Sequence, residues 1–98
     1  MVKPGSKDHK ASILITGMEL DELKRFVWMM AESFGLDRRI ANYQGVRPMG
    51  LYRWDIECLV EVIDSVLNDP EYYPTQDSLE YHVIKNLRDR LQVEENAL

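Results

Sequence analysis

The chain has 98 residues, of which 45% are hydrophobic and 30% are charged, and its net charge at pH 7 is −5. This composition is typical of one folded domain with a thin core, and it excludes a disordered segment and a multidomain enzyme. No apolar run reaches the roughly 20 residues that a membrane span needs, and no secretory signal opens the chain, so we expect neither a membrane protein nor an exported one. The single cysteine, Cys58, cannot form an internal disulfide, which favours a cytoplasmic location.

Residues 1–11 are expected to form a mobile tail, because they hold three lysines with Pro4 and Gly5 and almost nothing apolar. A single helical domain is then expected to cover residues 12–98. The apolar run at 12–16 has the composition of a short strand. We find no second alternating run to pair with it, so we predict an extended arm that packs on the helices.

A helix over about residues 18–34 is the clearest local prediction. Thr16 and Glu19 have the spacing of a capping box, in which each side chain binds a free backbone N–H at the helix start. Apolar residues recur every three or four positions, which places them on one helix face, and Gly35 is a typical terminating residue. The predicted face consists of Leu20, Leu23, Val27, Met30 and Phe34.

Three further helices are predicted over about residues 37–43, 51–68 and 75–94. Pro48 opposes helical geometry at the residue before it, so 46–50 should be a loop. Tyr72 and Tyr73, between the two long helices, are expected to close one end of the core. Amphipathic helices with short connections must bury their apolar faces against one another. The predicted fold is therefore all-α, a small bundle of three main helices with a short fourth helix.

The sequence carries no recognised motif for catalysis, a cofactor or a metal. Cys58 and His82 form the one pair suited to nucleophilic chemistry, and we expect a small core residue and a partly exposed histidine instead. Glu57, Glu61 and Asp64 fall on the polar side of their helix, where carboxylates are normally solvated. We therefore expect no enzyme, no cofactor and no metal site.

Charge is sharply segregated along the chain. The segment 38–54, here called the arginine connector, contains four arginines and no Asp or Glu, whereas 55–84 contains eight acids and no Lys or Arg. Arginine suits bidentate contacts with carboxylates or phosphates, and it stacks on aromatic rings. The connector residues that we expect to contact a partner are Arg38, Arg39, Tyr43, Arg47, Arg53 and Trp54.

Three interpretations of the arginine connector stay open. It could dock on an acidic protein surface, such as that of a second copy in a homodimer. It could bind single-stranded nucleic acid or another phosphate ligand, although the acidity of the whole chain opposes this. Its arginines could also pair with acids of their own chain, as surface ion pairs that contribute little.

The segment 26–30 is apolar around the whole helix, although only Val27 and Met30 belong to the main face. Trp28 and Met29 therefore need a second cover, which is either another part of the chain or a partner. With Trp54, they represent surplus apolar surface. Our leading hypothesis is a non-catalytic cytoplasmic protein-interaction module, able to self-associate, and the alternative is binding of nucleic acid or a phosphate ligand.

Overall fold

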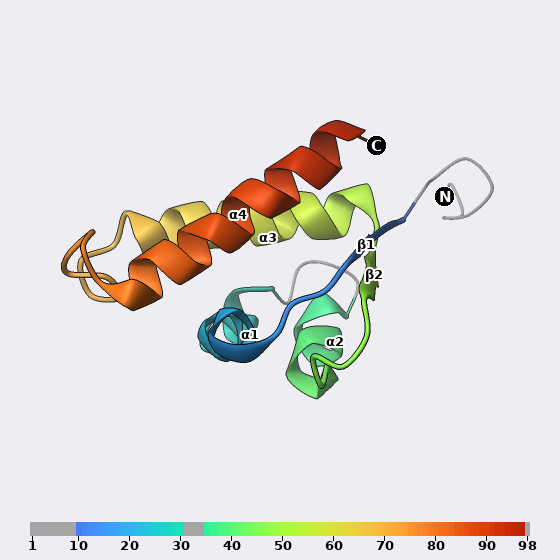
Figure 1. Ribbon diagram of the computed structural model, residues 1–98, viewed down its shortest axis with the longest axis horizontal. Coiled ribbons are helices and arrows are strands. Elements are labelled where there is room, and N and C mark those ends of the chain that lie inside the picture. The colour runs from blue at the N-terminus through green and yellow to red at the C-terminus, as the bar shows by residue number, and fades with distance from the viewer. Residues whose placement is uncertain (1–9, 31–34, 98) are drawn as a thin grey trace.

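The computed structural model describes residues 10–30 and 35–97 and shows a mostly helical fold with one small sheet (Figure 1). The predicted helical class is confirmed, with the sheet as an addition. In chain order the elements are β1 (Ala11–Ile13), α1 (Gly17–Lys24), the 3₁₀ helix η1 (Val27–Met30), α2 (Leu36–Asn42), β2 (Met49–Leu51), α3 (Arg53–Leu67) and α4 (Leu79–Ala97). Residues 1–9 of the expected tail lie outside the described residues, whereas Ala11 is buried in β1.

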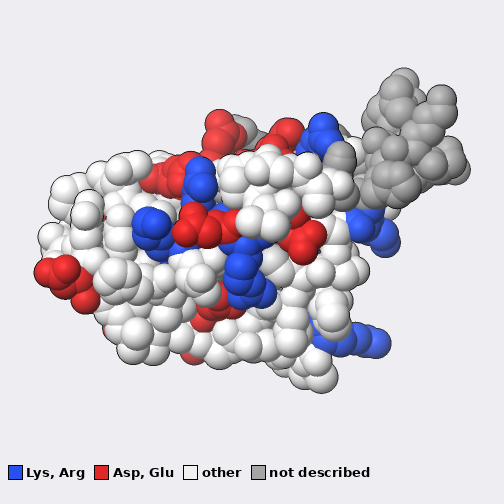
Figure 2. Space-filling view, turned by 45° about the horizontal axis from the view of Figure 1, so that its top comes forward, with Lys and Arg blue, Asp and Glu red and all other residues white. Residues whose placement is uncertain are grey.

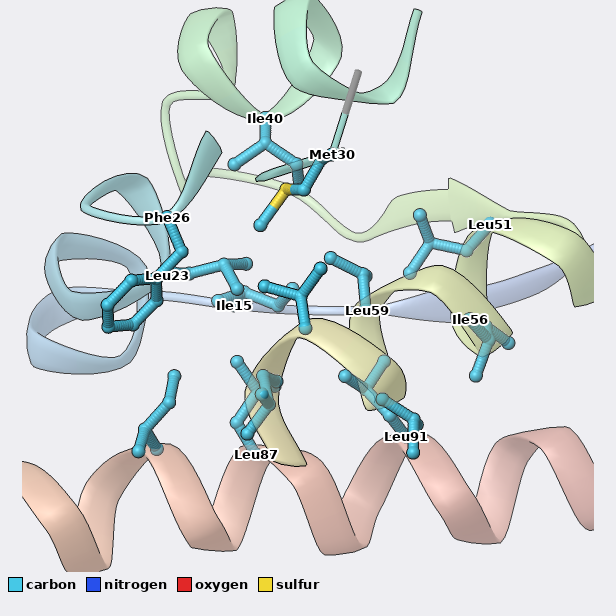
Figure 3. Packing of buried hydrophobic residues seen from close by; sticks show 14 of the residues in the cluster. Ile15, Leu23, Phe26, Met30, Ile40, Leu51, Ile56, Leu59, Leu87 and Leu91 are labelled. Atoms are coloured by element: carbon cyan, nitrogen blue, oxygen red, sulfur yellow. The ribbon is translucent and has the colours of Figure 1, made fainter. Parts of the chain in front are cut away.

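The core lies around α3, which has α4 on one side and η1 and α2 on the other (Figures 1 and 3). The apolar side chains of α3 cover a wide face because it must contact both layers. The connector at 68–78 closes one end through Tyr73, as predicted. Figure 3 shows side chains from all the helices converging on one cluster, which includes Ile15, Leu23, Phe26, Met30, Ile40, Ile56, Leu59, Leu87 and Leu91.

The first helix is shorter than predicted, because the chain leaves α-helical geometry after Lys24. The backbone N–H groups of Arg25, Phe26 and Met29 each donate to the carbonyl three residues earlier, which is the 3₁₀ pattern. This tighter turn places Phe26 in the core, where its ring meets Tyr72 edge to face with 5.3 Å between centroids. Phe34, the last residue of the predicted face, lies outside the described residues.

The predicted capping box at Thr16 is wrong. Thr16 occupies the N-cap position but its side chain makes no capping hydrogen bond. Glu19 is drawn away because its two carboxylate oxygens accept hydrogen bonds of 2.6 and 2.7 Å from Nη1 of Arg90 in α4. A charged guanidinium is a stronger partner than a backbone N–H. Nη2 of Arg90 also donates to the Leu14 carbonyl at 2.6 Å, which ties the N-terminal arm to α4.

The prediction that the run at 12–16 has no strand partner is also wrong. β1 pairs antiparallel with β2, with Ile13 opposite Met49 and Ala11 opposite Leu51. β2 was not predicted, because three residues with Gly50 at their centre are too short to show an alternating pattern. It overlaps the end of the loop expected at 46–50 and the first residue of the helix expected at 51–68. Beyond β1 the chain does continue as an arm, with Ile15 fully buried against the helices.

Candidate interaction surface

Trp28 is the most unusual surface residue of the described chain, because 66% of this large apolar side chain is exposed. It makes no hydrogen bond, ring stack or cation–π contact with the described residues. Met29, which the sequence placed beside it, is instead half-buried and packs against the core. The surplus of apolar surface predicted for the segment 26–30 is therefore concentrated in Trp28.

The 3₁₀ turn determines what lies next to Trp28. Side chains three residues apart lie one above the other in this geometry, so Arg25 and Trp28 share one side of the turn. Arg25 is also exposed, whereas Phe26 and Met30 point into the core. Arg25, which precedes Trp28 by three residues in the chain, also lines a cavity.

This cavity, here called the Glu22 cavity, has a volume of about 510 Å³ and lies between α1 and the connector before α4. Its lining residues are Glu22, Arg25, Tyr72, Tyr73, Pro74, Thr75, Ser78 and Glu80. Sequence reasoning missed this site because its residues come from two segments about 50 positions apart that share no motif. The one available signal was the tyrosine pair, which was expected to cover the core.

Glu22 is the chemical centre of the cavity. It is only 8% exposed, although it is charged. Its Oε1 accepts hydrogen bonds from the Tyr73 hydroxyl at 2.8 Å and from Nη1 of Arg25 at 2.7 Å. Burial, and secondly the bond to Glu22, raises the pKa of Tyr73 above its ordinary value of 10.0. The phenol therefore stays protonated and acts as a donor to the carboxylate.

Arg39 of the arginine connector is held within its own chain. It donates to Oδ2 of Asp55 at 3.0 Å and to the Gly50 carbonyl at 2.8 Å. Asp55 is fully buried at the start of α3, where the same Oδ2 accepts the Tyr52 N–H at 3.1 Å. For this arginine the internal interpretation is correct, and its role is to join α2, β2 and α3.

Two of the remaining connector residues, Tyr43 and Arg47, line a separate cavity of about 570 Å³ together with Val46 and Met49. The Tyr43 hydroxyl donates to the Arg47 carbonyl at 2.5 Å, which fixes the loop between them. Trp54 is half-buried and stacks on Tyr52 with 4.7 Å between ring centroids. Arg38 and Arg47 are exposed and form no ion pair with the described acids, and Arg53 is also exposed.

Charge segregation along the sequence is partly resolved by folding. On the face shown in Figure 2, acidic and basic side chains are interleaved across the middle of the molecule. Two contacts between distant segments contribute to this mixing, namely Arg88 with Asp64 at 2.8 Å and Arg90 with Glu19 at 2.6 Å. Both cations come from α4, after the acidic segment ends.

Other kinds of site have little support in the described part of the chain. No group of three or more His, Cys, Asp or Glu side chains there could hold a metal ion. Cys58 is half-buried and His82 is exposed. None of the helices among these residues is long and apolar enough to cross a bilayer. We compared the chain with protein-family models, curated proteins and solved structures, and none of the three gave a match.

Proposed function

We propose that this chain is a non-catalytic interaction module that works in the cytoplasm and binds a protein partner through the surface around Trp28. The exposure of Trp28, 66% of an indole side chain, is the observation that carries the proposal. Tryptophan, tyrosine and arginine dominate the energetics of protein interfaces. Arg25, which precedes Trp28 by three residues in the chain, lines the Glu22 cavity together with Tyr72.

Self-association is the simplest form of this function. Arg38 and Arg47 are exposed basic residues, while Glu57 and Glu61 are exposed acids on α3. In a dimer, the exposed acids of α3 in one copy can therefore pair with the arginine connector of the other copy. The same contact would cover the Trp28 surface. A domain with a thin core gains stability from such a contact, and a two-fold dimer is the commonest arrangement.

Sedimentation velocity over a micromolar concentration range tests the proposal. We expect a dimer for the original chain and a shift toward monomer for Trp28→Ala, because truncating a central aromatic residue costs about 2 kcal/mol or more, roughly a 30-fold loss of affinity. Val93→Ala is the matched control, since Val93 is an equally exposed apolar residue on α4.

A second measurement covers the case in which the partner is a different protein. Trp54→Phe leaves Trp28 as the only source of tryptophan fluorescence, and acrylamide should quench it strongly in the isolated chain. A monomer whose Trp28 is protected from the quencher would overturn the proposal.

Phosphate binding by the arginine connector is the second candidate function. It is supported by the two exposed arginines, Arg38 and Arg47, that have no acidic partner among the described residues. The stacking of Tyr52 on Trp54 weighs against it, because these rings already cover each other rather than receiving bases. A fluorescence titration with single-stranded oligonucleotides at low ionic strength decides the question, and no binding there excludes it.

A further inference from the structure

We propose that the Glu22 cavity is a pocket for a basic side chain, a lysine or an arginine, of the protein partner. The proposal gives the partner's chemistry at the edge of the Trp28 surface, and so it rests on the function proposed above. Three features carry it: a carboxylate with a free oxygen at the floor, aromatic walls that already hold one cation, and a surrounding excess of acids.

The floor of the cavity offers an acceptor that is only partly used. Both hydrogen bonds to Glu22, from Arg25 and from Tyr73, fall on Oε1. No described residue donates to Oε2. No buried side-chain oxygen or nitrogen among the described residues lacks a partner, so Oε2 still reaches the solvent. A carboxylate oxygen in a partly desolvated recess forms strong hydrogen bonds with ammonium or guanidinium donors.

The aromatic rings around the cavity already contact one cation, the guanidinium of Arg25. The guanidinium carbon of Arg25 lies 5.8 Å from the ring centroid of Tyr73, a lining residue, within the range of cation–π attraction. It also lies 5.4 Å from the ring centroid of Phe26, which is fully buried and does not line the cavity. Almost half of the Arg25 side chain remains exposed, so it covers the opening without filling it. The ring of Tyr72 adds a further apolar wall.

The surroundings favour a cation over an anion. Glu80 also lines the cavity, and the segment before it in sequence adds Asp69, Glu71 and Asp77 with no lysine or arginine between. This local charge attracts a basic side chain and repels a phosphate or a carboxylate. Arg25 offsets one of these acids, and so it competes with an incoming cation.

A titration with N-acetyl-lysinamide, followed by amide chemical shifts, tests the pocket directly. N-acetyl-norleucinamide is the matched probe, since it has nearly the same length without the charge. We expect the lysine probe to shift the amide signals of Glu22, Tyr72 and Thr75, and the norleucine probe to leave them in place. Equal responses to both probes would overturn the proposal.

Variants of the lining residues test whether each one strengthens or weakens binding of the lysine probe. Arg25→Ala removes the internal competitor and should tighten binding of the lysine probe about threefold, whereas Glu22→Gln should abolish it. Should Glu22→Gln fail to fold, Glu80→Gln at the exposed rim should still weaken binding, with Glu57→Gln on α3 as the unaffected control. Weaker binding by Arg25→Ala would point to an anionic ligand and overturn the assignment.

The proposed cation pocket and the proposed Trp28 interface can be refuted independently of each other. The lysine probe is too small to need Trp28, so Trp28→Ala should leave its affinity unchanged while it abolishes binding of the protein partner.

Discussion

Removing Arg39 should destabilise the fold far more than removing a comparable arginine at the surface. Arg39 is the ion-pair partner of Asp55, whose side chain is 0% exposed. In Arg39→Met this carboxylate keeps its hydrogen bond to the Tyr52 N–H but loses its ion pair with Arg39 in a place that water does not reach. Breaking a buried pair from one side typically costs about 3–5 kcal/mol.

Removing the acid of this pair instead of the arginine should lower the free energy of unfolding by less. In Asp55→Asn the charge left behind is that of Arg39, whose side chain is 36% exposed and can be hydrated. We expect about 2 kcal/mol, the worth of a hydrogen bond to a charged group, because solvent recovers part of the loss. The inequality between the two variants therefore follows from the unequal burial of the two partners.

Urea unfolding monitored by circular dichroism measures both costs. With a slope of about 1.5 kcal/mol per molar urea for a domain of this size, Arg39→Met should lower the midpoint by roughly 2–3 M. Arg88→Met is the matched control, since its partner Asp64 has a side chain that is 45% exposed. That variant should cost about 1 kcal/mol or less. Equal losses for the two arginine variants would refute the reasoning from burial.

Three further predictions concern other parts of the fold. Gly45→Ala should lower the free energy of unfolding in urea by about 2 kcal/mol or more, because φ at Gly45 is +72° and the new Cβ would lie 3.1 Å from the Ile15 carbonyl oxygen. Gly17→Ala is the control: φ there is +56° but the space around it is open, so the loss should be about 1 kcal/mol. The raised pKa of Tyr73 means that the folded state holds the phenol proton more tightly, so the contribution of Tyr73 to stability should be constant well below pH 10 and fall as the pH rises toward the folded pKa. Tyr73→Phe should flatten this fall between unfolding curves at pH 9 and pH 11, and an unchanged slope would contradict it. Arg90→Met should speed hydrogen exchange of the Ile13 amide more than exchange of the α3 amides, because it removes the hydrogen bond that holds the N-terminal arm at Leu14. Equal acceleration of both sets of amides would argue against a local role of Arg90 in holding the arm.

The sequence predicted the helical elements well where a long amphipathic face dominates. The helix expected at 51–68 is observed as α3 (Arg53–Leu67), and the short one at 37–43 as α2 (Leu36–Asn42). The last helix was expected at about 75–94 and is observed as α4 (Leu79–Ala97), so both of its ends lie a few residues later than predicted. Such faces are visible in sequence because burial repeats with the helical period.

The incorrect predictions share one cause: residues distant in sequence provide stronger partners than the local ones on which the predictions were based. The capping box at Thr16 was a sound local pattern, but Arg90 binds Glu19 from α4. The helix through Phe26 had good spacing, but a 3₁₀ turn places that ring in the core against Tyr72. Local patterns carry no information about such partners, so they could not show which arrangement has the lower free energy.

The candidate site was predicted only in part. Trp28 stood out because a helix that is apolar all round needs additional cover, and its exposure agrees with one of the two expected outcomes. Arg39 was grouped with the other arginines because sequence shows charge but not burial, and its partner Asp55 was counted only as one of the eight acids of the segment 55–84. The Glu22 cavity could not be found at all, since it needs α1 and the 68–78 connector side by side.

The bonds of Arg90 to Glu19 and Leu14 span 71 and 76 residues. On the ribosome, the N-terminal arm is therefore synthesised long before the helix that holds it in place. Until α4 emerges, Ile15 and Leu23 lack part of their cover, and β1 is left with only β2 as a neighbour. Contacts of such long sequence separation close late and slow folding. The nascent chain should thus pass through a stage in which its first strand and helix are open to chaperones or to other strands.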